Sequence, residues 1–251
     1  NLPAMLASPT VLRALRSKNR YSATSADQLP HMFAAYQMFG HQLLMPVPDV
    51  DRTDFMVLLG ANPLASGGSL MTAPGIHRRL KAIRDRGGEV WVVDPRRTET
   101  ARVATQHVFI RPGTDALLLM SLAHTVFARD AVRLGALEAH CRGLDALRVA
   151  AADFPPDVTA PFTGVSAATV EDLVSRLLAA PRATIYGRMG TSTQPFGGLC
   201  AWLVYALNTI TGNLDREGGA MFTRPALDPI GAGGRIGVGR GSHGRWQSRV
   251  R

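Results

Sequence analysis

The chain has 251 residues, of which 46% are hydrophobic and 19% charged, as in an ordinary globular protein with one large domain or two small ones. Its formal net charge of +9 indicates a solvated basic surface or an anionic partner, but no RNA- or DNA-binding signature accompanies the arginines, so we expect no nucleic acid. Two cysteines, Cys141 and Cys200, exclude a disulfide framework and a cysteine-rich zinc or iron–sulfur site within these residues.

Short apolar runs alternate with helical patterns along most of the chain. Continuous apolar runs, typical of parallel strands covered on both faces, predict strands at 54–59, 89–93, 107–110 and 183–186. Capping residues and periodicity predict helices over 74–86, 99–106, 114–130, 166–180 and 197–213. This alternation predicts an α/β fold: a doubly wound, mainly parallel, Rossmann-like sheet flanked by helices.

Two stretches have weaker patterns. Between the third and fourth strands we predict one helix from about Leu134 to Ala151, followed by a proline-rich loop through Thr163. After Gly218 the chain becomes glycine-rich and polar, which predicts an irregular C-terminal tail with little capacity to form a core.

Nothing in the sequence indicates a membrane span or a targeting segment. The longest apolar runs, around 117–127 and 198–210, are too short to cross a bilayer, and no signal peptide is present. We therefore expect a cytoplasmic location. The first residue is Asn1 and not a methionine, which suggests a fragment or a processed piece.

The loops that follow the four predicted strands are rich in glycine, hydroxyl, arginine and acidic residues. They are residues 60–68, 94–100, 111–115 and 187–198. Glycine and proline are ordinary loop residues, so each loop alone says little. Because the carboxyl ends of parallel strands meet at one edge, where open α/β sheets bind ligands, the four loops together predict a binding edge.

The residue types on this edge suit a purine dinucleotide-like ligand. Gly60, Gly67 and Gly68 let backbone amides approach a pyrophosphate, and Asp94 is placed to accept hydrogen bonds from a ribose. Arg96 or Arg97 would neutralise phosphate, and Asp115 would accept from the ring nitrogens of guanine. An acid at a helix start is also common for structural reasons.

Two familiar nucleotide motifs are absent. No G-x-G-x-x-G follows the first strand, which disfavours a nicotinamide-dependent dehydrogenase. No G-K-[ST] occurs, which excludes a P-loop.

Five segments carry a resemblance to a known family. They are "LLGANP" (58–63), "VVDPRRTETARVA" (92–104), "FIRPGTDALLL" (109–119), "YGRMGTSTQPFG" (186–197) and "TGNLDREGGAMF" (211–222). In order and spacing the chain resembles the molybdopterin oxidoreductases of the dimethyl sulfoxide reductase family, which includes formate dehydrogenases and nitrate reductases. Those enzymes hold molybdenum or tungsten between two molybdopterin guanine dinucleotides. The resemblance implies that residues 1–225 form one dinucleotide-binding αβα domain, and that 226–251 begin a neighbouring domain or form a disordered tail.

The resemblance also implies roles for individual residues. Gly60, Ala61 and Asn62 would face the pyrophosphate; Asp94, Arg97, Thr98 and Thr100 the guanosine; Gly113, Thr114 and Asp115 the guanine; Met189 and Gly190 the pterin and metal. The implied metal ligand lies within residues 19–30, where Ser22 is our choice and Ser25 its rival. A serine there is equally suited to capping the helix that follows.

Three further residues are candidates for contact with substrate. Arg188 and His31 are placed to face it, although surface roles are the alternative, and Arg224 lies near the position of an arginine that serves formate enzymes. Ala23 follows Ser22 where formate dehydrogenases have a histidine, which puts formate chemistry in doubt.

The leading hypothesis is a portion of a molybdenum or tungsten oxidoreductase that performs two-electron redox chemistry or oxygen-atom transfer on a small substrate, with an electron-transfer subunit as partner. The family's N-terminal segment with its [4Fe–4S] cluster and its C-terminal domain have no counterpart in these residues, so we expect the chain alone to be inactive. The alternative is a non-catalytic pterin- or nucleotide-binding remnant, or a subunit of a larger complex.

Overall fold

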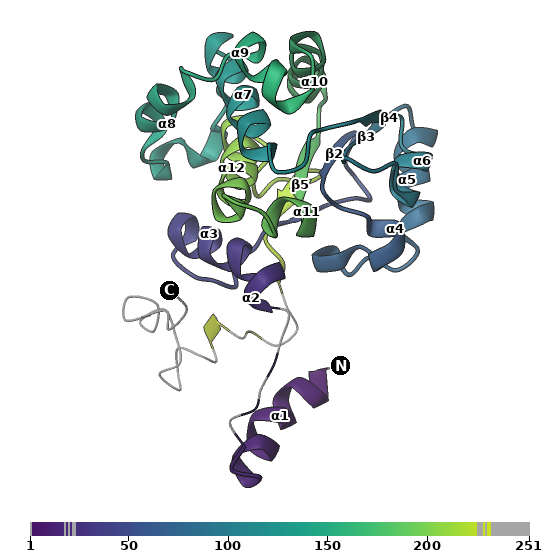
Figure 1. The fold of residues 1–251 in the computed structure, drawn as a ribbon, viewed down its shortest axis with the longest axis vertical. Helices are drawn as coiled ribbons and strands as arrows, with labels where there is room; N and C mark the ends of the chain where they lie inside the picture. Colours follow the sequence, from purple (N-terminus) through teal and green to yellow (C-terminus); the bar gives the residue numbers. More distant parts are fainter. Residues whose placement is uncertain are drawn as a thin grey trace.

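The computed structural model describes residues 2–17, 19, 21, 24–224, 228, 230 and 231. Its centre is a four-stranded sheet in the order β4-β3-β2-β5 (Figure 1). The strands are β2 (Phe55–Leu59), β3 (Glu89–Val93), β4 (Gln106–Val108) and β5 (Ala183–Gly187). All three pairings, β2 with β3, β2 with β5 and β3 with β4, are parallel. The predicted parallel sheet is confirmed, although β4 ends at Val108 and not at Ile110.

Successive residues of β2, β3 and β5 enter two separate cores, one on each face of the sheet. In β2, Phe55, Val57 and Leu59 join the first core, whereas Met56 and Leu58 join the second. Helices α7 (Asp115–Ala128), α10 (Ala167–Ala179) and α12 (Gly197–Ile210) cover the first face. Helices α5 (Ile76–Asp85) and α6 (Glu99–Val103) cover the second. The helices on both faces give the doubly wound, three-layer fold that the sequence predicts (Figure 1).

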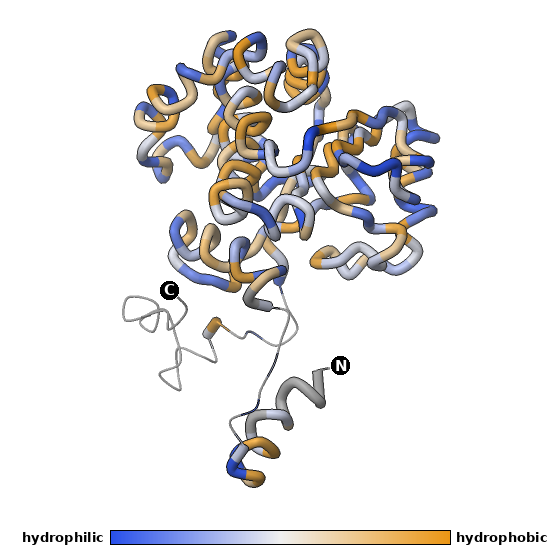
Figure 2. Tube along the Cα trace, in the orientation of Figure 1, coloured by the Kyte–Doolittle hydropathy of each residue, from blue (hydrophilic) through white to orange (hydrophobic). Residues whose placement is uncertain are grey.

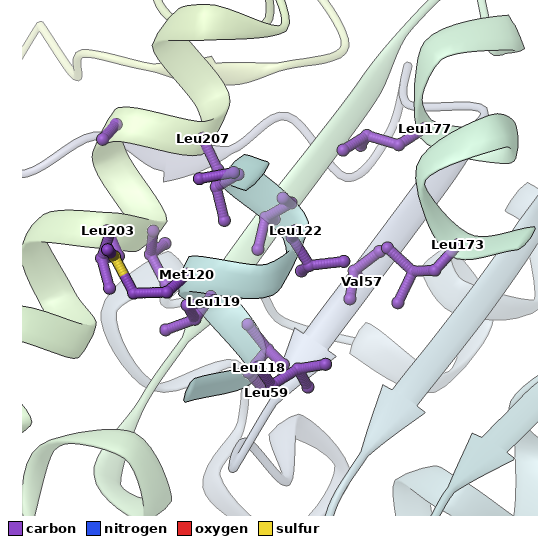
Figure 3. Packing of buried hydrophobic residues seen from close by; sticks show 14 of the residues in the cluster. Val57, Leu59, Leu118, Leu119, Met120, Leu122, Leu173, Leu177, Leu203 and Leu207 are labelled. Atoms are coloured by element: carbon purple, nitrogen blue, oxygen red, sulfur yellow. The ribbon is translucent and has the colours of Figure 1, made fainter. Parts of the chain in front are cut away.

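The first core is the larger of the two and is built mainly from leucine, valine and alanine. Leu118 and Leu122 of α7, Leu173 of α10 and Leu203 of α12 are all at most 1% exposed and gather on the face of β2 that carries Val57 (Figure 3). Burying one such side chain completely contributes roughly 1.5–3 kcal/mol. The strand ends therefore project from a densely packed platform, and in Figure 2 the strands run as hydrophobic segments through the body.

Strand β5 lies at one edge of the sheet, and two asparagines cover its free side. The side-chain amide of Asn208 in α12 accepts a hydrogen bond from Ile185 N (Oδ1, 3.0 Å) and donates to Ile185 O (Nδ2, 2.8 Å). Asn213 Oδ1 accepts from Ala183 N at 3.2 Å. These side chains take the place of a fifth strand, so the edge presents fewer unpaired backbone groups.

The prediction for residues 134–163 is wrong. The structure has a 3₁₀ helix η2 (Gly135–His140), then helix α8 (Leu144–Ala151) and helix α9 (Pro156–Thr163) in the predicted loop. Gly143 adopts a left-handed conformation (φ +80°), which interrupts the helical pattern. Pro155 is extended and Pro156 occupies the first turn of α9, where a proline needs no hydrogen-bond donor.

The N-terminal part consists of α1 (Leu2–Ala14), α2 (Thr24–Asp27) and α3 (Leu29–Phe39). Helix α3 packs against α12, whereas α1 lies apart from the body in Figure 1. A small antiparallel sheet joins β1 (Val47–Pro48) to β6 (Ala220–Met221). Within the described part of the chain, every helix is too short or too polar to traverse a lipid bilayer. The predicted boundary at residue 226 lies among residues outside the description and stays a prediction.

Candidate functional site

The order of the strands in the sheet reverses at β2. From β2 the chain continues through β3 to β4 on one side, and it then returns to β5 on the other side of β2. Such a reversal of strand order is where open α/β sheets bind ligands. A cavity of about 510 Å³ opens at this point, within the range of small-molecule sites. We call it the switch-point cavity.

Most of the predicted cofactor-binding residues line the switch-point cavity. They are Gly60, Ala61 and Asn62 after β2, Asp94 and Thr98 after β3, and Met189 and Gly190 after β5. Another cavity, of about 640 Å³, lies beside Arg133 and Thr211, away from these strand ends. The strand topology therefore selects the switch-point cavity as the candidate site, although it is the smaller of the two.

Two glycines form a contact that no side chain would permit. Gly190 N donates to Gly60 O at 2.9 Å, and a Cβ built on Gly60 would lie 2.7 Å from Gly190 Cα. Gly60 also has φ +53°, which disfavours any other residue. The loops after β2 and β5 thus meet backbone to backbone beside the cavity. Bare backbone of this kind suits the close approach of a phosphate or a flat ring system.

The side chain of Asn62 is occupied by protein partners. Its Oδ1 accepts from Thr100 Oγ1 at 2.7 Å, and its Nδ2 donates to Glu99 Oε2 at 2.7 Å. Thr100 is fully buried, and its hydroxyl also accepts from Leu64 N at 3.2 Å. Asn62 and Thr100 therefore fix the loop after β2 against α6, and only Asn62 of the two borders the cavity.

The loop after β3 is organised by short-range side-chain contacts. Asp94 Oδ1 accepts from Arg96 N at 2.8 Å, and Thr98 Oγ1 accepts from Ala101 N at 3.1 Å as the N-cap of α6. Both Arg96 and Arg97 are exposed, but only Arg96 is in the cavity lining. From the sequence, either arginine could bind phosphate. Arg96 differs from Arg97 in that its backbone N–H is held by Asp94 in the turn.

None of the predicted guanine-binding residues is in the lining of the cavity. Asp115 begins α7, is 6% exposed, and its Oδ2 accepts from Gln194 Nε2 at 2.7 Å. The same Nε2 donates to Gly190 O at 2.9 Å, so one side chain links Asp115 to the cavity wall. Burial raises the pKa of Asp115, and the hydrogen bond from Gln194 opposes that rise. Gly113 is exposed, and the Thr114 hydroxyl donates to Arg111 O.

Gln194 belongs to a stretch that the sequence singles out, but its own role was not predicted. Its Oε1 is buried and is without a hydrogen-bond partner among the described residues. A buried acceptor left unpaired costs about 1–3 kcal/mol, so Gln194 is placed to receive one further hydrogen bond.

Arg188 and His31 are buried, at 5% and 2% exposure, so the surface-role alternative for both is wrong. Arg188 Nε donates to Ser69 Oγ at 2.7 Å, and one terminal nitrogen pairs with Asp27 Oδ1 at 2.7 Å. Asp27 and Ser69 both border the switch-point cavity. Asp27 falls within residues 19–30, which the resemblance singled out for another role, and no pattern pointed to Ser69. They come close to Arg188 only through the tertiary structure.

His31 connects α3 to α11 (Met189–Ser192) and α12 through a buried hydrogen-bond chain. The Ser192 hydroxyl lies between His31 Nε2 (2.9 Å) and Arg188 O (3.2 Å), and Tyr205 Oη lies 3.4 Å from His31 Nδ1. Burial, reinforced by the nearby Arg188 cation, lowers the pKa of His31 to about 4. The native state therefore holds His31 neutral at physiological pH.

The depressed pKa of His31 predicts a specific pH dependence of stability. Between pH 6.5 and about 4 the unfolded chain binds a proton that the native state resists, so stability is complete above pH 6.5 and falls as the pH decreases. We expect a loss of about 3 kcal/mol in the free energy of unfolding across this window. Urea denaturation at several pH values measures it.

The matched variants are His31→Gln, which cannot titrate, and His140→Gln, at an exposed position on η2. The first is expected to flatten the slope between pH 4 and 6.5 and the second to keep the wild-type slope. An unchanged slope in His31→Gln would show that other groups cause the acid sensitivity.

Among the remaining predicted residues, Arg224 is not in the lining of the cavity. Ser22 lies outside the described residues, and Ser25 belongs to α2. Arg224 is exposed. In the part of the chain that the structure describes, no three histidine, cysteine, aspartate or glutamate side chains are grouped to hold a metal ion.

Comparison with known proteins identifies the family of this chain. Residues 4–234 match the family model described as molybdopterin oxidoreductase, which covers the whole sheet and all loops around the switch-point cavity. The chain belongs to that family. The predicted resemblance is confirmed, and so is the fold that the resemblance implied.

The individual relatives are longer than this chain. It is 27% identical over 215 residues to a dimethyl sulfoxide/trimethylamine N-oxide reductase from Cereibacter sphaeroides, covering 82% of this chain and 26% of that protein. It is 29% identical over 190 residues to the "menaquinone reductase, molybdopterin-binding-like subunit" of Nitratidesulfovibrio vulgaris, covering 74% and 26%. Among solved structures, acetylene hydratase from Pelobacter acetylenicus has the same fold, with a TM-score of 0.66 at 21% identity over 81% of this chain and 27% of that one. The chain thus spans about a quarter of these relatives.

Proposed function

We propose that this chain is the cofactor-holding portion of a molybdenum or tungsten oxidoreductase, with part of a molybdopterin guanine dinucleotide in the switch-point cavity. The observation that carries the proposal is the meeting of the β2 and β5 loops at Gly60 and Gly190, beside a cavity at the topological switch point of a family member. The bound cofactor would supply two-electron redox or oxygen-atom transfer on a small substrate, and the protein would position it.

The residues of the cavity suit the polar parts of such a ligand. Gly60 and Ala61 offer backbone without bulky side chains, and Arg96 brings a cation to the same wall, where it would neutralise a phosphate. Asp94, on the neighbouring loop, would accept from a ribose hydroxyl. Met189 is 58% exposed and would contact the flat pterin.

Other parts of the proposal concern a longer protein, of which this chain would be one portion. Ser22, or Ser25 on α2, is proposed as the metal ligand, and Arg224 as a substrate contact. A [4Fe–4S] cluster in an N-terminal segment and an electron-transfer subunit would complete the enzyme in the cytoplasm. We propose that turnover requires those additional parts and that the 251 residues alone are inactive.

A second function has one observation in its favour. The relative from Nitratidesulfovibrio vulgaris is named as a molybdopterin-binding-like subunit. A non-catalytic pterin- or nucleotide-binding subunit of a larger complex would use the same cavity. Metal analysis of the purified full-length protein separates the two, because only the enzyme needs molybdenum or tungsten.

The guanine end of the proposed ligand is tested at Asp115. Guanine offers two adjacent donors that a carboxylate accepts, and losing a charge-assisted bond costs about 1.5–3 kcal/mol. Asp115→Ala is therefore expected to weaken GDP binding by about tenfold or more in calorimetric titration, and to leave ADP binding nearly unchanged.

The matched control is Asp157→Ala, which removes an exposed acid from the first turn of α9. It is expected to bind GDP as the wild type does. Equal losses for GDP and ADP in Asp115→Ala would mean that Asp115 serves only the start of α7. Absence of GDP binding in the wild type would count against the proposed function itself.

A further inference from the structure

One buried guanidinium joins three segments that are far apart in sequence. Arg188 follows β5, Ser69 lies in the 3₁₀ helix η1 (Ser69–Met71), and Asp27 is the last residue of α2. The Arg188 side chain is 6% exposed and that of Asp27 is 30% exposed. Their ion pair is therefore largely removed from solvent, where a charge pair is screened less than at the surface.

The backbone of Arg188 is a fixed point of the fold. Its N–H donates to Leu59 O at 3.1 Å, which continues the pairing of β2 with β5. Its carbonyl accepts from Thr191 N at 2.8 Å and from Ser192 N at 3.1 Å, which starts α11. The guanidinium therefore extends from the rigid sheet, and any segment bound to it takes its position from the sheet.

Helix α2 leads directly into α3, because Gln28 N donates to Thr24 O at 3.0 Å and Met32 N donates to Gln28 O at 2.9 Å. It has only four residues, and it packs against α3 and α11. A helix this short is not stable by itself, so its position depends on tertiary contacts. The pair between Asp27 and Arg188 joins α2 to the loop after β5 at the wall of the switch-point cavity, because both residues line it.

We infer that Arg188 is a positioning residue: through its ion pair with Asp27 it fastens α2 over the switch-point cavity and controls the passage of ligand into and out of it. The identity of the ligand rests on the proposed function, whereas the fastening of α2 does not. Arg188 acts here through Asp27 and needs no contact with substrate.

The test compares two aspartates that each pair with an arginine. Asp27→Asn removes the charge from the pair with Arg188. Asp54→Asn is the matched control, because Asp54 pairs with Arg182 at 2.8 Å and 2.9 Å at the opposite ends of β2 and β5. Hydrogen exchange of the 251-residue chain, read by mass spectrometry, reports on α2 without any ligand.

We expect exchange in residues 24–28 to become at least tenfold faster in Asp27→Asn, with the strands unaffected. Asp54→Asn should leave α2 as in the wild type, and the conservative variant Asp27→Glu should restore most of the protection. Unchanged exchange of α2 in Asp27→Asn would overturn the inference.

The second measurement uses a fluorescent GDP in stopped flow. In Asp27→Asn both the association and the dissociation rate constants should rise by about threefold or more, with a smaller change in Kd. Faster exchange of α2 with unchanged GDP rates would show that α2 does not control access, and this would also overturn the inference. If GDP fails to bind the wild type, the proposed function fails, and the exchange result alone decides whether Arg188 fastens α2.

Discussion

Replacing Gly60 with alanine is expected to lower the free energy of unfolding by about 2–5 kcal/mol. The left-handed conformation of Gly60 (φ +53°) costs an L-residue about 1–2 kcal/mol. The added Cβ would also lie within 2.8 Å of backbone atoms of Gly190 and Thr191, which cannot rotate away as a side chain would. Forcing extra volume into such a contact costs about 1–3 kcal/mol more.

Urea denaturation measures this loss, and Gly67→Ala is the matched control. Gly67 also has a positive φ (+64°), but a Cβ there meets nothing within 4 Å. The control should therefore lose only about 1–2 kcal/mol, the cost of the backbone conformation alone. Equal losses in the two variants would mean that the contact between Gly60 and Gly190 yields readily and does not shape the cavity.

Asn208→Leu is expected to destabilise the protein by about 3–5 kcal/mol, because it leaves the N–H and C=O of Ile185 without partners in a buried environment. Leucine has a similar size, so the loss reports on hydrogen bonding and not on a cavity. Thermal denaturation followed by circular dichroism would show it as a lowered Tm.

The control for Asn208 is its neighbour Thr209→Val. Thr209 is also buried, but its hydroxyl donates only to Tyr205 O within the same helix. That substitution should cost about 1 kcal/mol or less. A loss of that size in Asn208→Leu as well would indicate that water or another group satisfies the edge of β5.

The tie between Arg188 and Asp27 and the contact between Gly60 and Gly190 concern the same cavity from different sides. The glycine contact fixes the loops after β2 and β5 to each other, and the ion pair fixes α2 to the loop after β5. Both depend on residues at the carboxyl ends of adjacent parallel strands. Substitutions at these positions should therefore be tested for stability and for ligand rates in separate experiments.

The sequence by itself determined the family, the sheet and the edge that bears the candidate site. Strands β2, β3 and β5 are continuous apolar runs, because a parallel strand covered by helices on both faces must be apolar on both. The loops after them are recognisable for the same reason: polar, glycine-rich residues begin where the two-sided burial ends. The turn at Asp94 and the cap at Thr98 are also local, since each bonds within three residues.

Residues 134–163 show where local pattern misleads. The sequence predicted a single helix and a loop, but Gly143 interrupts the helix and Pro156 begins another. Helical propensity and loop composition compete there at similar strength. Packing against α7, which α8 and α9 both contact, decides the outcome.

Only the tertiary structure decided which polar residues work together at the cavity. Ser69 and Asp27 lie 119 and 161 residues from Arg188 along the chain, and no periodicity or motif links the three. The same holds for Gln194 with Asp115, and for Asn208 with the edge of β5. Such pairs form because the sheet brings distant loops to one edge and excludes water from them. A polar group there must find its partner in space, and its neighbours in sequence do not reveal which one it finds.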